Sequence, residues 1–431
     1  MSANNNEPLI SISHKIELKP NNKAKTHFKK AFGCSRLAYN WGLAKWKEYY
    51  EKGIKKSHLE LKKEFNAIKK DEFPFVYEVS KYATQQPFLN LNLAFNKFFR
   101  DLKVGKISYP KFKKKKDNFG SYYIGGDQII IKDNKYLKIP NFGLVKMREN
   151  LRFNGKINAV TISQKADKFY ASFSMQISSD EYNKTHKIAN LTNQSIGIDL
   201  GIKEFVCLSN GLAIKAPKPL NKLTRLIVKR SRELTKKQHA KTKQEAISGV
   251  KKSNNYIKSS AKLAKLHSKI ANIRSDFLHK LSSVIVKHYD YIGLESLNIQ
   301  GMMKNHRLAK SLADISFYEF NRELEYKSNY QKKQICRVDK FFPSSKNCSV
   351  CGNVKKELKL SERIYKCDAC KSVIDRDLNA SINLHKFVNE TVGLVQSEFT
   401  PMDLTALLDD LAINQIVTSK VEVGIQQKSY L

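Results

Sequence analysis

The chain is short of acidic residues and lacks a long apolar run. Its 431 residues include 40 Asp and Glu against 78 Lys and Arg, a formal net charge of +38. No apolar segment reaches the ~18–20 residues that a membrane-spanning helix needs. The first eight residues are polar and have no secretory hydrophobic region. We therefore expect a soluble, intracellular (cytoplasmic) protein without a membrane partner.

Cysteine is also scarce, and its count is odd. Four of the seven cysteines are clustered, whereas Cys34, Cys207 and Cys336 lie scattered in apolar or helical surroundings. An odd number of cysteines in a reducing compartment argues against a disulfide framework and a secreted scaffold. We interpret the three scattered cysteines as core residues.

Positive charge is what the sequence has in excess. Repulsion among like charges at a net charge of +38 is unfavourable unless a polyanion neutralises them. Nucleic acid is the favoured partner, an anionic membrane surface is a weaker alternative, and a small-molecule enzyme is a poor match. The hydrophobic fraction of 41% is that of a globular protein. The length predicts about three domains.

The first ~190 residues read as strands that flank a helical block. Residues 9–19 alternate apolar and polar side chains as a strand does, and residues 23–99 have helical spacing. Residues 110–116 form a basic loop. Three later segments again have strand character: 128–131, 159–163 and 170–177.

The second half predicts mixed α/β structure. Asn210-Gly211 is a strong hairpin signal, because both residues tolerate positive φ. Residues 391–431 carry no motif, and we expect a poorly ordered tail there. The other predicted elements are strands over 196–200 and 205–208, a basic helical region over 222–281, a strand over 284–294, a helix over 311–330 and a strand over 334–338.

The clustered cysteines have the spacing of a zinc site. They form two Cys-x2-Cys pairs separated by fifteen residues: Cys348, Cys351, Cys367 and Cys370. Two such hairpins can arrange four thiolates tetrahedrally around Zn²⁺ at about 2.3 Å, with no position left for water, which predicts a structural ion. Gly352 follows the first hairpin as such turns require, whereas Lys371 stands where a second glycine is usual. The alternative is that these are buried or redox cysteines.

Acidic residues stand at the ends of predicted strands and at a helix start. Asp199 lies within an apolar strand, where a charged carboxylate is unfavourable unless it is paired or bound to metal. Glu295 directly follows another strand, and it could simply be a solvated strand end. Asp375 and Asp377 precede a helix, and either could be only its N-cap.

Taken together, these acids predict a metal-dependent nuclease site. Three converging carboxylates can bind two Mg²⁺ or Mn²⁺ ions ~3.5–4 Å apart, which activate a water and stabilise the leaving oxygen of a phosphodiester. Hard oxygen ligands suit Mg²⁺. An aspartate flanked by Gly197 and Gly201 and followed by a hairpin is how ribonuclease-H-like folds begin.

At this point the sequence resembles a known family, the TnpB (OrfB) proteins of bacterial insertion sequences, which are similar to compact type V CRISPR effectors. The resemblance is concentrated in residues 195–387 and weaker before them. The matching segments are SRLAYNWGL (35–43), SYPKFKKK (108–115), GIDLGIKEFVCLSNG (197–211), ANIRSDFLHKLS (271–282), IGLESLNIQGM (292–302), FFPSSKNCSVCG (341–352), ERIYKCDAC (362–370) and DRDLNASINL (375–384).

The resemblance implies an RNA-guided DNA endonuclease with a RuvC-type active site. Its partners would be a guide RNA from the element's end and double-stranded target DNA, with the element's transposase as a further candidate, in the bacterial nucleoid. By motif, the catalytic residues are Asp199, Glu295 and Asp377, with Asp375 as the alternative to Asp377. Arg363 matches a family arginine that orients or stabilises the scissile phosphate.

The resemblance also implies a domain order of mixed α/β and α+β class. An RNase-H-like (RuvC) core with a four-cysteine zinc-ribbon insert follows a β-rich, wedge-like domain that carries a helical recognition block. The expected ranges are 1–22 and 104–190 for the wedge-like domain, 23–103 for the recognition block, 191–342 and 374–390 for the nuclease core, 343–373 for the insert that binds target nucleic acid, and 391–431 for the tail.

Phosphate contacts are expected from the densest basic segments, although a solvated helix face is the alternative. In guided nucleases the protein reads backbone geometry while base pairing reads sequence. Two other functions fit the same fold: a conventional transposase that joins strands itself, and a regulator with an inactive nuclease core. The candidate phosphate contacts are Lys113, Lys114, Lys115, Arg225, Lys229, Arg230, Lys236 and Lys237.

Overall fold

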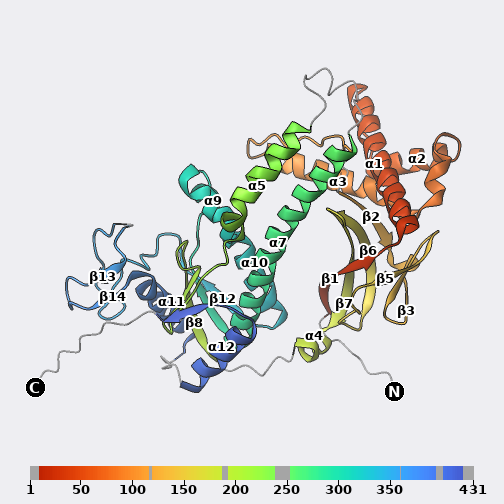
Figure 1. Ribbon diagram of the computed structural model, residues 1–431. Helices are drawn as coiled ribbons and strands as arrows, with labels where there is room; N and C mark the ends of the chain where they lie inside the picture. The colour runs from red at the N-terminus through yellow and green to blue at the C-terminus, as the bar shows by residue number, and fades with distance from the viewer. Residues whose placement is uncertain are drawn as a thin grey trace, which may run out of the picture. The chain divides into compact units, whose positions relative to one another are not determined.

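The chain folds into two units, each built on a β-sheet of its own (Figure 1). The structure is a computed structural model that describes residues 9–115, 119–186, 193–237, 253–359, 361–394 and 401–420. The first unit comprises Met1–Thr185 and Arg230–Ser268, and the second His186–Lys229 and Lys269–Leu431. Helices α5 (Pro219–Lys236) and α7 (Asn254–His288) contribute to both. Within the described ranges, no helix has the length and apolar character needed to span a membrane.

A seven-stranded antiparallel sheet forms the first unit, in the order β2-β6-β7-β1-β5-β4-β3. The strand predicted over 9–19 is confirmed as β1, whose alternate side chains are buried. The strand predicted over 128–131 is wrong in its first part, because η2 (Gly126–Gln128) is a 3₁₀ turn there. The strands are β1 (Leu9–Lys19), β2 (Phe119–Gly125), β3 (Ile130–Lys132), β4 (Tyr136–Ile139), β5 (Gly143–Met147), β6 (Lys156–Lys165) and β7 (Lys168–Ser178), followed by helix α4 (Ser179–His186).

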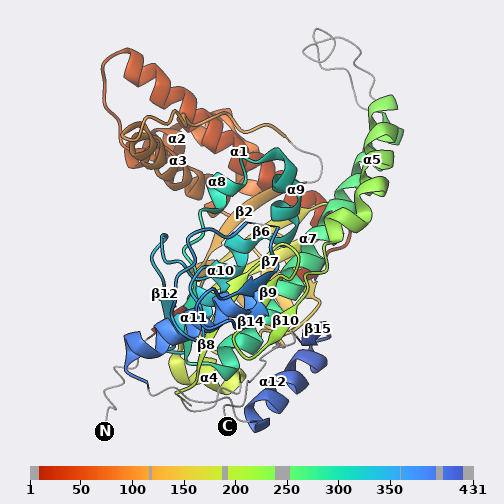
Figure 2. The ribbon, with the colours of Figure 1, turned by 90° about the vertical axis from the view of Figure 1, so that its left-hand side faces the viewer.

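Three helices inserted after β1 form the block predicted from helical spacing (Figure 2). The Asn21 side chain caps the first by accepting from the Ala24 amide at 2.8 Å, and Ser57 caps the second. Trp41 is partly buried and packs edge-on against Phe65 of the helical core, with ring centroids 5.2 Å apart. The elements are α1 (Asn22–Glu51), α2 (His58–Glu72), η1 (Pro74–Glu78) and α3 (Tyr82–Leu102).

The second unit contains a mixed six-stranded sheet in the order β12-β11-β8-β9-β10-β15. Strand β11 is parallel to both β8 and β12, whereas β8, β9, β10 and β15 pair antiparallel in succession. Gly211, at φ +87°, forms the predicted turn between β9 and β10. The strands are β8 (Ser195–Leu200), β9 (Val206–Leu208), β10 (Leu212–Ile214), β11 (Tyr291–Leu294), β12 (Gln334–Arg337), β13 (Ile364–Lys366), β14 (Val373–Asp375) and β15 (Thr418–Lys420).

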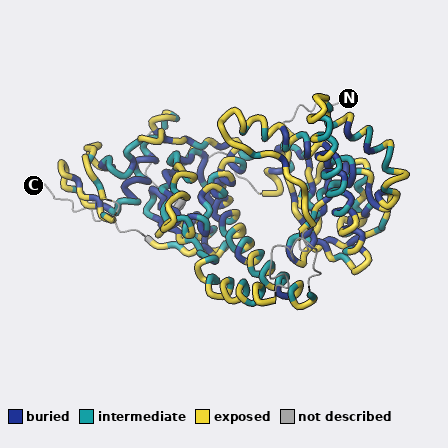
Figure 3. Tube along the Cα trace, turned by 90° about the horizontal axis from the view of Figure 1, so that it is seen from above, coloured by how far each residue is buried: buried dark blue, intermediate teal, exposed yellow. Residues whose placement is uncertain are grey.

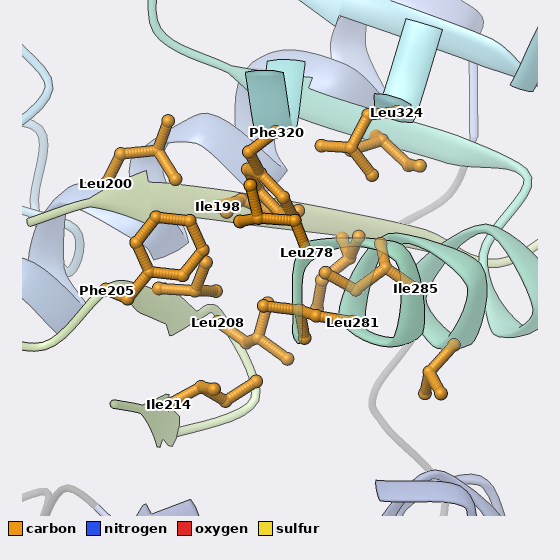
Figure 4. Packing of buried hydrophobic residues seen from close by; sticks show 14 of the residues in the cluster. Ile198, Leu200, Phe205, Leu208, Ile214, Leu278, Leu281, Ile285, Phe320 and Leu324 are labelled. Atoms are coloured by element: carbon orange, nitrogen blue, oxygen red, sulfur yellow. The ribbon is translucent and has the colours of Figure 1, made fainter. Parts of the chain in front are cut away.

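Helices α7 and α10 (Phe317–Tyr330) pack on this sheet through a continuous apolar core (Figure 4). Ile198 of β8 points into that core, where α7 contributes Leu281 and α10 contributes Phe320. Figure 3 shows buried residues gathered inside each unit and exposed residues along outer helix faces. The remaining helices are α8 (Ile299–Met302), α9 (His306–Ile315), α11 (Arg376–Val392) and α12 (Pro401–Ile413).

Two sequence predictions for the second unit are wrong. Residues 284–288 belong to helix α7, because their apolar side chains continue its buried face before β11 begins. Residues 401–420 are ordered and do not form a loose tail. Leu407 and Leu411 of α12 are buried in the core, and β15 pairs with β10 at the edge of the sheet.

The two-unit division does not test the five domain ranges expected from the sequence. Helices α1 to α3 span Asn22–Leu102, inside a unit that also holds the first sheet. The assignment of wedge-like, recognition, nuclease and zinc-binding ranges stays a prediction.

Candidate active site and cysteine cluster

Two of the predicted catalytic carboxylates lie at the same edge of the second unit's sheet. Asp199 is half-buried near the end of β8, between buried Ile198 and Leu200. In the parallel pair of β8 and β11, Ile198 is in register with Leu294, so Glu295 follows in step with Asp199. Carboxyl ends of adjacent parallel strands meet at one edge. The tertiary pairing therefore brings these acids together.

Helix α11 carries the third carboxylate and reaches the sheet across two glycines. A Cβ on Gly197 would lie 1.9 Å from the Ser381 carbonyl oxygen, and one on Gly293 would lie 2.9 Å from that of Leu384. Only glycine permits so close an approach of helix to strand. Because side chains alternate along a strand, Gly197 and Asp199 face α11, while Ile198 faces the opposite core.

Asp377 lies in the first turn of α11, close to the β8 end. Its Oδ2 atom is 4.0 Å from the position that a Cβ on Gly201 would take, two residues beyond Asp199. Burial raises the pKa of Asp199 well above its ordinary value. The negative charges of Glu295 and Asp377 raise this pKa further, so both acids lie close enough to act on Asp199.

Two arginines surround Asp377. Arg376 Nη2 lies 3.2 Å from its Oδ1 atom, and Arg363 Nη1 lies 3.5 Å from its Oδ2 atom. The structure thus brings the predicted Arg363 to the acidic site. Arg376 was not singled out from the sequence, although its place beside Asp377 in the DRD motif could have suggested it.

The side chain of Asp375 caps helix α11. Its Oδ1 atom accepts hydrogen bonds from the amides of Asp377 at 2.9 Å and Leu378 at 3.1 Å, which makes it the N-cap of α11. The N-cap interpretation therefore applies to Asp375. This commitment favours Asp377 over Asp375 as the metal ligand.

The four clustered cysteines converge in space as their spacing predicts. Their sulfur atoms all lie within 4.8 Å of one another. Cys348 Sγ is 3.7 Å from Cys370 Sγ, and Cys351 Sγ is 3.6 Å from Cys367 Sγ. Tetrahedral Zn²⁺ takes four thiolates at about 2.3 Å, so this donor set fits the ion after a small contraction.

The backbone turns after the two cysteine pairs are equivalent. Gly352 follows the first pair at φ +77°, and Lys371 follows the second at φ +60°. Lysine thus adopts the left-handed conformation that glycine usually supplies, and its amine donates to the Asp368 carbonyl at 2.8 Å. The three scattered cysteines, Cys34, Cys207 and Cys336, are buried as predicted.

The acidic residues are more widely spaced than the thiols. Among the residues described, the cysteine cluster alone brings three or more His, Cys, Asp or Glu ligand atoms within 4.8 Å. The three carboxylates are therefore not gathered as closely as the four thiols.

The predicted phosphate contacts differ in their surroundings. The Lys113 amine lies 3.8 Å from the centroid of the Tyr39 ring. Arg230 bonds Glu233 at 2.8 Å, and Lys237 bonds the Ser259 hydroxyl at 2.8 Å. The other predicted contacts are exposed: Lys114, Lys115, Arg225, Lys229 and Lys236.

A groove in the first unit adds basic residues that sequence reasoning missed. Lys15, Arg36 and Lys165 line it together with Lys113 and Lys114. Burial lowers the pKa of Lys15, and the positive charge of Lys165 lowers it further. The residues come from β1, α1, β6 and the basic loop, so their gathering had no signal in the linear sequence.

Three family models match the chain in order. They are a helix-turn-helix domain of OrfB proteins over residues 10–55, the OrfB model described as "Probable transposase" over 180–306, and a "Cas12f1-like, TNB domain" over 317–384. In this chain, residues 10–55 fold as a strand and one long helix.

Curated relatives match over most of the chain. A "Putative RNA-guided DNA endonuclease" of Streptomyces pristinaespiralis is 28% identical, with 87% of this chain and 89% of that protein covered. "Putative RNA-guided DNA endonuclease InsQ" of Escherichia coli (strain K12) is 27% identical, with 86% and 90% covered.

Two further matches are more limited. A "TnpB-like protein L79" of Acanthamoeba polyphaga mimivirus is 31% identical over 26% of this chain and 22% of its own length. A solved structure described as "Cryo-EM structure of the Cas12f1-sgRNA-target DNA complex" has a TM-score of 0.31 and 15% identity, covering 87% of this chain and 99% of that one. By the ordered family matches and the long relatives, the chain is similar to the TnpB (OrfB) proteins of insertion sequences.

Proposed function

We propose that this chain is an RNA-guided, metal-dependent DNA endonuclease of a transposable element. The observation that carries the proposal is the convergence of Asp199, Glu295 and Asp377 at one edge of the second sheet. Two relatives that match nearly the whole chain are named as RNA-guided DNA endonucleases, which supports the same activity here.

The three carboxylates would hold two Mg²⁺ or Mn²⁺ ions. Carboxylate oxygens are the ligands that Mg²⁺ prefers. When bound, such a pair of ions supplies an activated water and stabilises the leaving oxygen of a phosphodiester. Asp199, whose pKa both other acids raise, would be one of the residues that hold the ions. Arg363 pairs with Asp377 and its side chain is half-exposed, so its guanidinium would be placed to contact the scissile phosphate.

The strand arrangement supports an RNase-H-like nuclease core over 191–342 and 374–390. Strands β8, β9 and β10 form an antiparallel hairpin succession, and β11 and β12 continue the sheet parallel to β8. This order is typical of RNase-H-like folds. It sets the acidic residues at the ends of β8 and β11, with α11 completing the site.

The four cysteines would hold one structural Zn²⁺ in a target-nucleic-acid-binding insert over 343–373. Four thiolates fill a tetrahedral site and leave no position for a reacting water. The Ser372 hydroxyl lies 3.4 Å from Cys348 Sγ and 3.2 Å from Cys370 Sγ, where it can hydrogen-bond the thiolates.

Guide RNA and target DNA would lie along basic surfaces of the first unit and of α5. The groove lined by Lys15, Lys113 and Lys165 gathers like charges that repel one another until an anion is present. We place it in the wedge-like domain (1–22 and 104–190), where it meets the helical recognition block (23–103). Binding to RNA should weaken with salt, with a log–log slope of ~0.7 per phosphate neutralised on a single strand.

The deciding experiment is sequencing of the RNA that copurifies with the chain from its native locus, followed by Mg²⁺-dependent cleavage with that RNA. A discrete RNA that directs cuts at matching DNA is the expected result, and Asp199→Ala should bind the RNA without cutting. Metal-dependent cutting without a discrete RNA would replace the proposal by a conventional transposase. RNA binding without cutting by the unmodified chain would favour a regulator.

A further inference from the structure

Ser344 contacts the acidic site from outside the set of predicted catalytic residues. Its hydroxyl donates a hydrogen bond to Glu295 Oε1, and its side chain is buried, with 4% of the residue exposed. Ser344 lies in the segment that leads from β12 to Cys348. A hydroxyl has one proton to donate, so this bond commits it to the carboxylate of Glu295.

Helix α11 holds Ser344 in place. The Asn383 side-chain amide, itself only 2% exposed, donates to the Ser344 carbonyl oxygen at 2.7 Å. The same amide donates to the Asn347 carbonyl oxygen at 2.7 Å, and so does that of Asn379. The Ser349 amide donates in turn to Asn379 Oδ1 at 2.9 Å. Hydrogen bonds from α11 therefore hold residues 344–349 against one face of this helix.

Helix α11 thus positions two of the three carboxylates. Asp377 belongs to α11, whereas Glu295 is reached from α11 through Asn383 and Ser344. A glutamate at a strand end has several rotatable bonds, and ordering it is entropically unfavourable. A buried hydroxyl that binds Oε1 restricts this freedom and leaves Oε2 for another ligand.

We propose that Ser344 is a positioning residue that orients Glu295 for metal binding and ties it to helix α11. The inference rests on the proposed nuclease site. Hydrogen bonds to metal ligands are worth ~10–100-fold in metal affinity. Loss of the hydroxyl should therefore weaken the binding of catalytic ions without removing any of their ligands.

The test is a Mn²⁺ titration of the full chain, followed by electron paramagnetic resonance. Asp199→Ala supplies the blank for ions held elsewhere. Ser344→Ala should raise the Mn²⁺ dissociation constant by at least ~10-fold, while Ser344→Thr, which keeps a hydroxyl, stays near the unmodified chain. The matched control is Ser345→Ala, because Ser345 is the next residue and has no hydrogen bond to Glu295.

A double-mutant cycle separates positioning from a general packing effect. In a Glu295→Gln background, Ser344→Ala should change Mn²⁺ affinity little, because the carboxylate it orients is already gone. Equal losses in both backgrounds would overturn the proposal. A Ser344→Ala chain that loses its zinc or its cooperative unfolding also counts against it, because the hydroxyl would then serve the fold.

The outcomes also distinguish this inference from the proposed function. If Asp199→Ala abolishes specific Mn²⁺ binding and Ser344→Ala leaves it unchanged, the positioning role is wrong and the acidic site stands. If Asp199→Ala leaves Mn²⁺ binding unchanged, the acidic site itself is wrong.

Discussion

The two candidate metal sites of this chain are assembled in opposite ways. The cysteine cluster comes from two short hairpins, and its four sulfur atoms lie within 4.8 Å of one another. The acidic site joins residues from β8, β11 and α11, and its carboxylates are more widely spaced. Thiol convergence follows from local turns, whereas carboxylate convergence depends on strand pairing and on a helix packed across Gly197 and Gly293.

Their surroundings differ as well. Burial raises the pKa of Asp199 and the negative charges of Glu295 and Asp377 raise it further, so the charged form of Asp199 is disfavoured without a cation. Buried amides of α11 and the Ser344 hydroxyl hold the segment beside them. Because the charged acids disfavour close approach, the acidic site depends on the rigidity of β8, β11 and α11.

The largest expected effect separates the two neighbouring aspartates. Asp377→Asn should lower the cleavage rate by ~10³-fold or more, as the loss of a group acting in a catalytic unit does. Asp375→Asn should cleave near the unmodified rate, because asparagine also caps a helix. Single-turnover cleavage at saturating Mg²⁺ measures both. The reverse ranking would move the metal ligand to Asp375.

The next effect concerns the cysteine cluster alone. Cys348→Ser should reduce bound zinc from one per chain to none and lower the melting temperature, because structural zinc contributes directly to folding energy. Cys336→Ala is the control, since Cys336 is equally buried but lies outside the cluster. Zinc analysis by mass spectrometry reads out both, and unchanged zinc in Cys348→Ser would exclude the four-cysteine site.

A smaller effect tests the packing on which the acidic site depends. Gly197→Ala should lower the free energy of unfolding by ~2–3 kcal/mol, because the added methyl meets the backbone of α11. Gly33→Ala, in α1, has open space around the new methyl and should raise stability by ~0.5–1 kcal/mol. Denaturant unfolding compares the two. Equal effects would mean that α11 is not held at Gly197.

The last effect appears only at low pH, and over most of the pH range it is the smallest. Burial lowers the pKa of His385 in α11 to about 4, and the positive charge of Lys386 contributes. In the unfolded chain the histidine pKa is near 6.5. Between about pH 4 and 6.5 the unfolded chain therefore binds more protons than the folded chain. The free energy of unfolding therefore has its full value above pH 6.5 and falls by up to ~3 kcal/mol as the pH approaches 4. Unfolding curves of the unmodified chain should show this slope, and His385→Gln should show less of it.

Much of the fold was predictable where the pattern is local. The strand over 9–19, the helices between residues 23 and 99 and the Asn210-Gly211 hairpin are confirmed, because alternation, helical spacing and turn chemistry act within a few residues. Prediction was wrong at 284–288, where an apolar run fits a buried helix as well as a strand. It was wrong again at α12, whose few buried side chains find their partners on distant elements.

Spacing along the chain is enough to predict which four cysteines converge, and the order of the motifs is enough to indicate the resemblance to TnpB (OrfB) proteins. Three relations appear only in the folded chain: Asp375 caps α11 while Asp377 lies near the end of β8, Lys15 and Lys165 share a groove with Lys113, and Ser344 donates a hydrogen bond to Glu295. These relations join residues far apart in sequence. They arise from strand register and from the close packing of α11 on glycine, which no local pattern records.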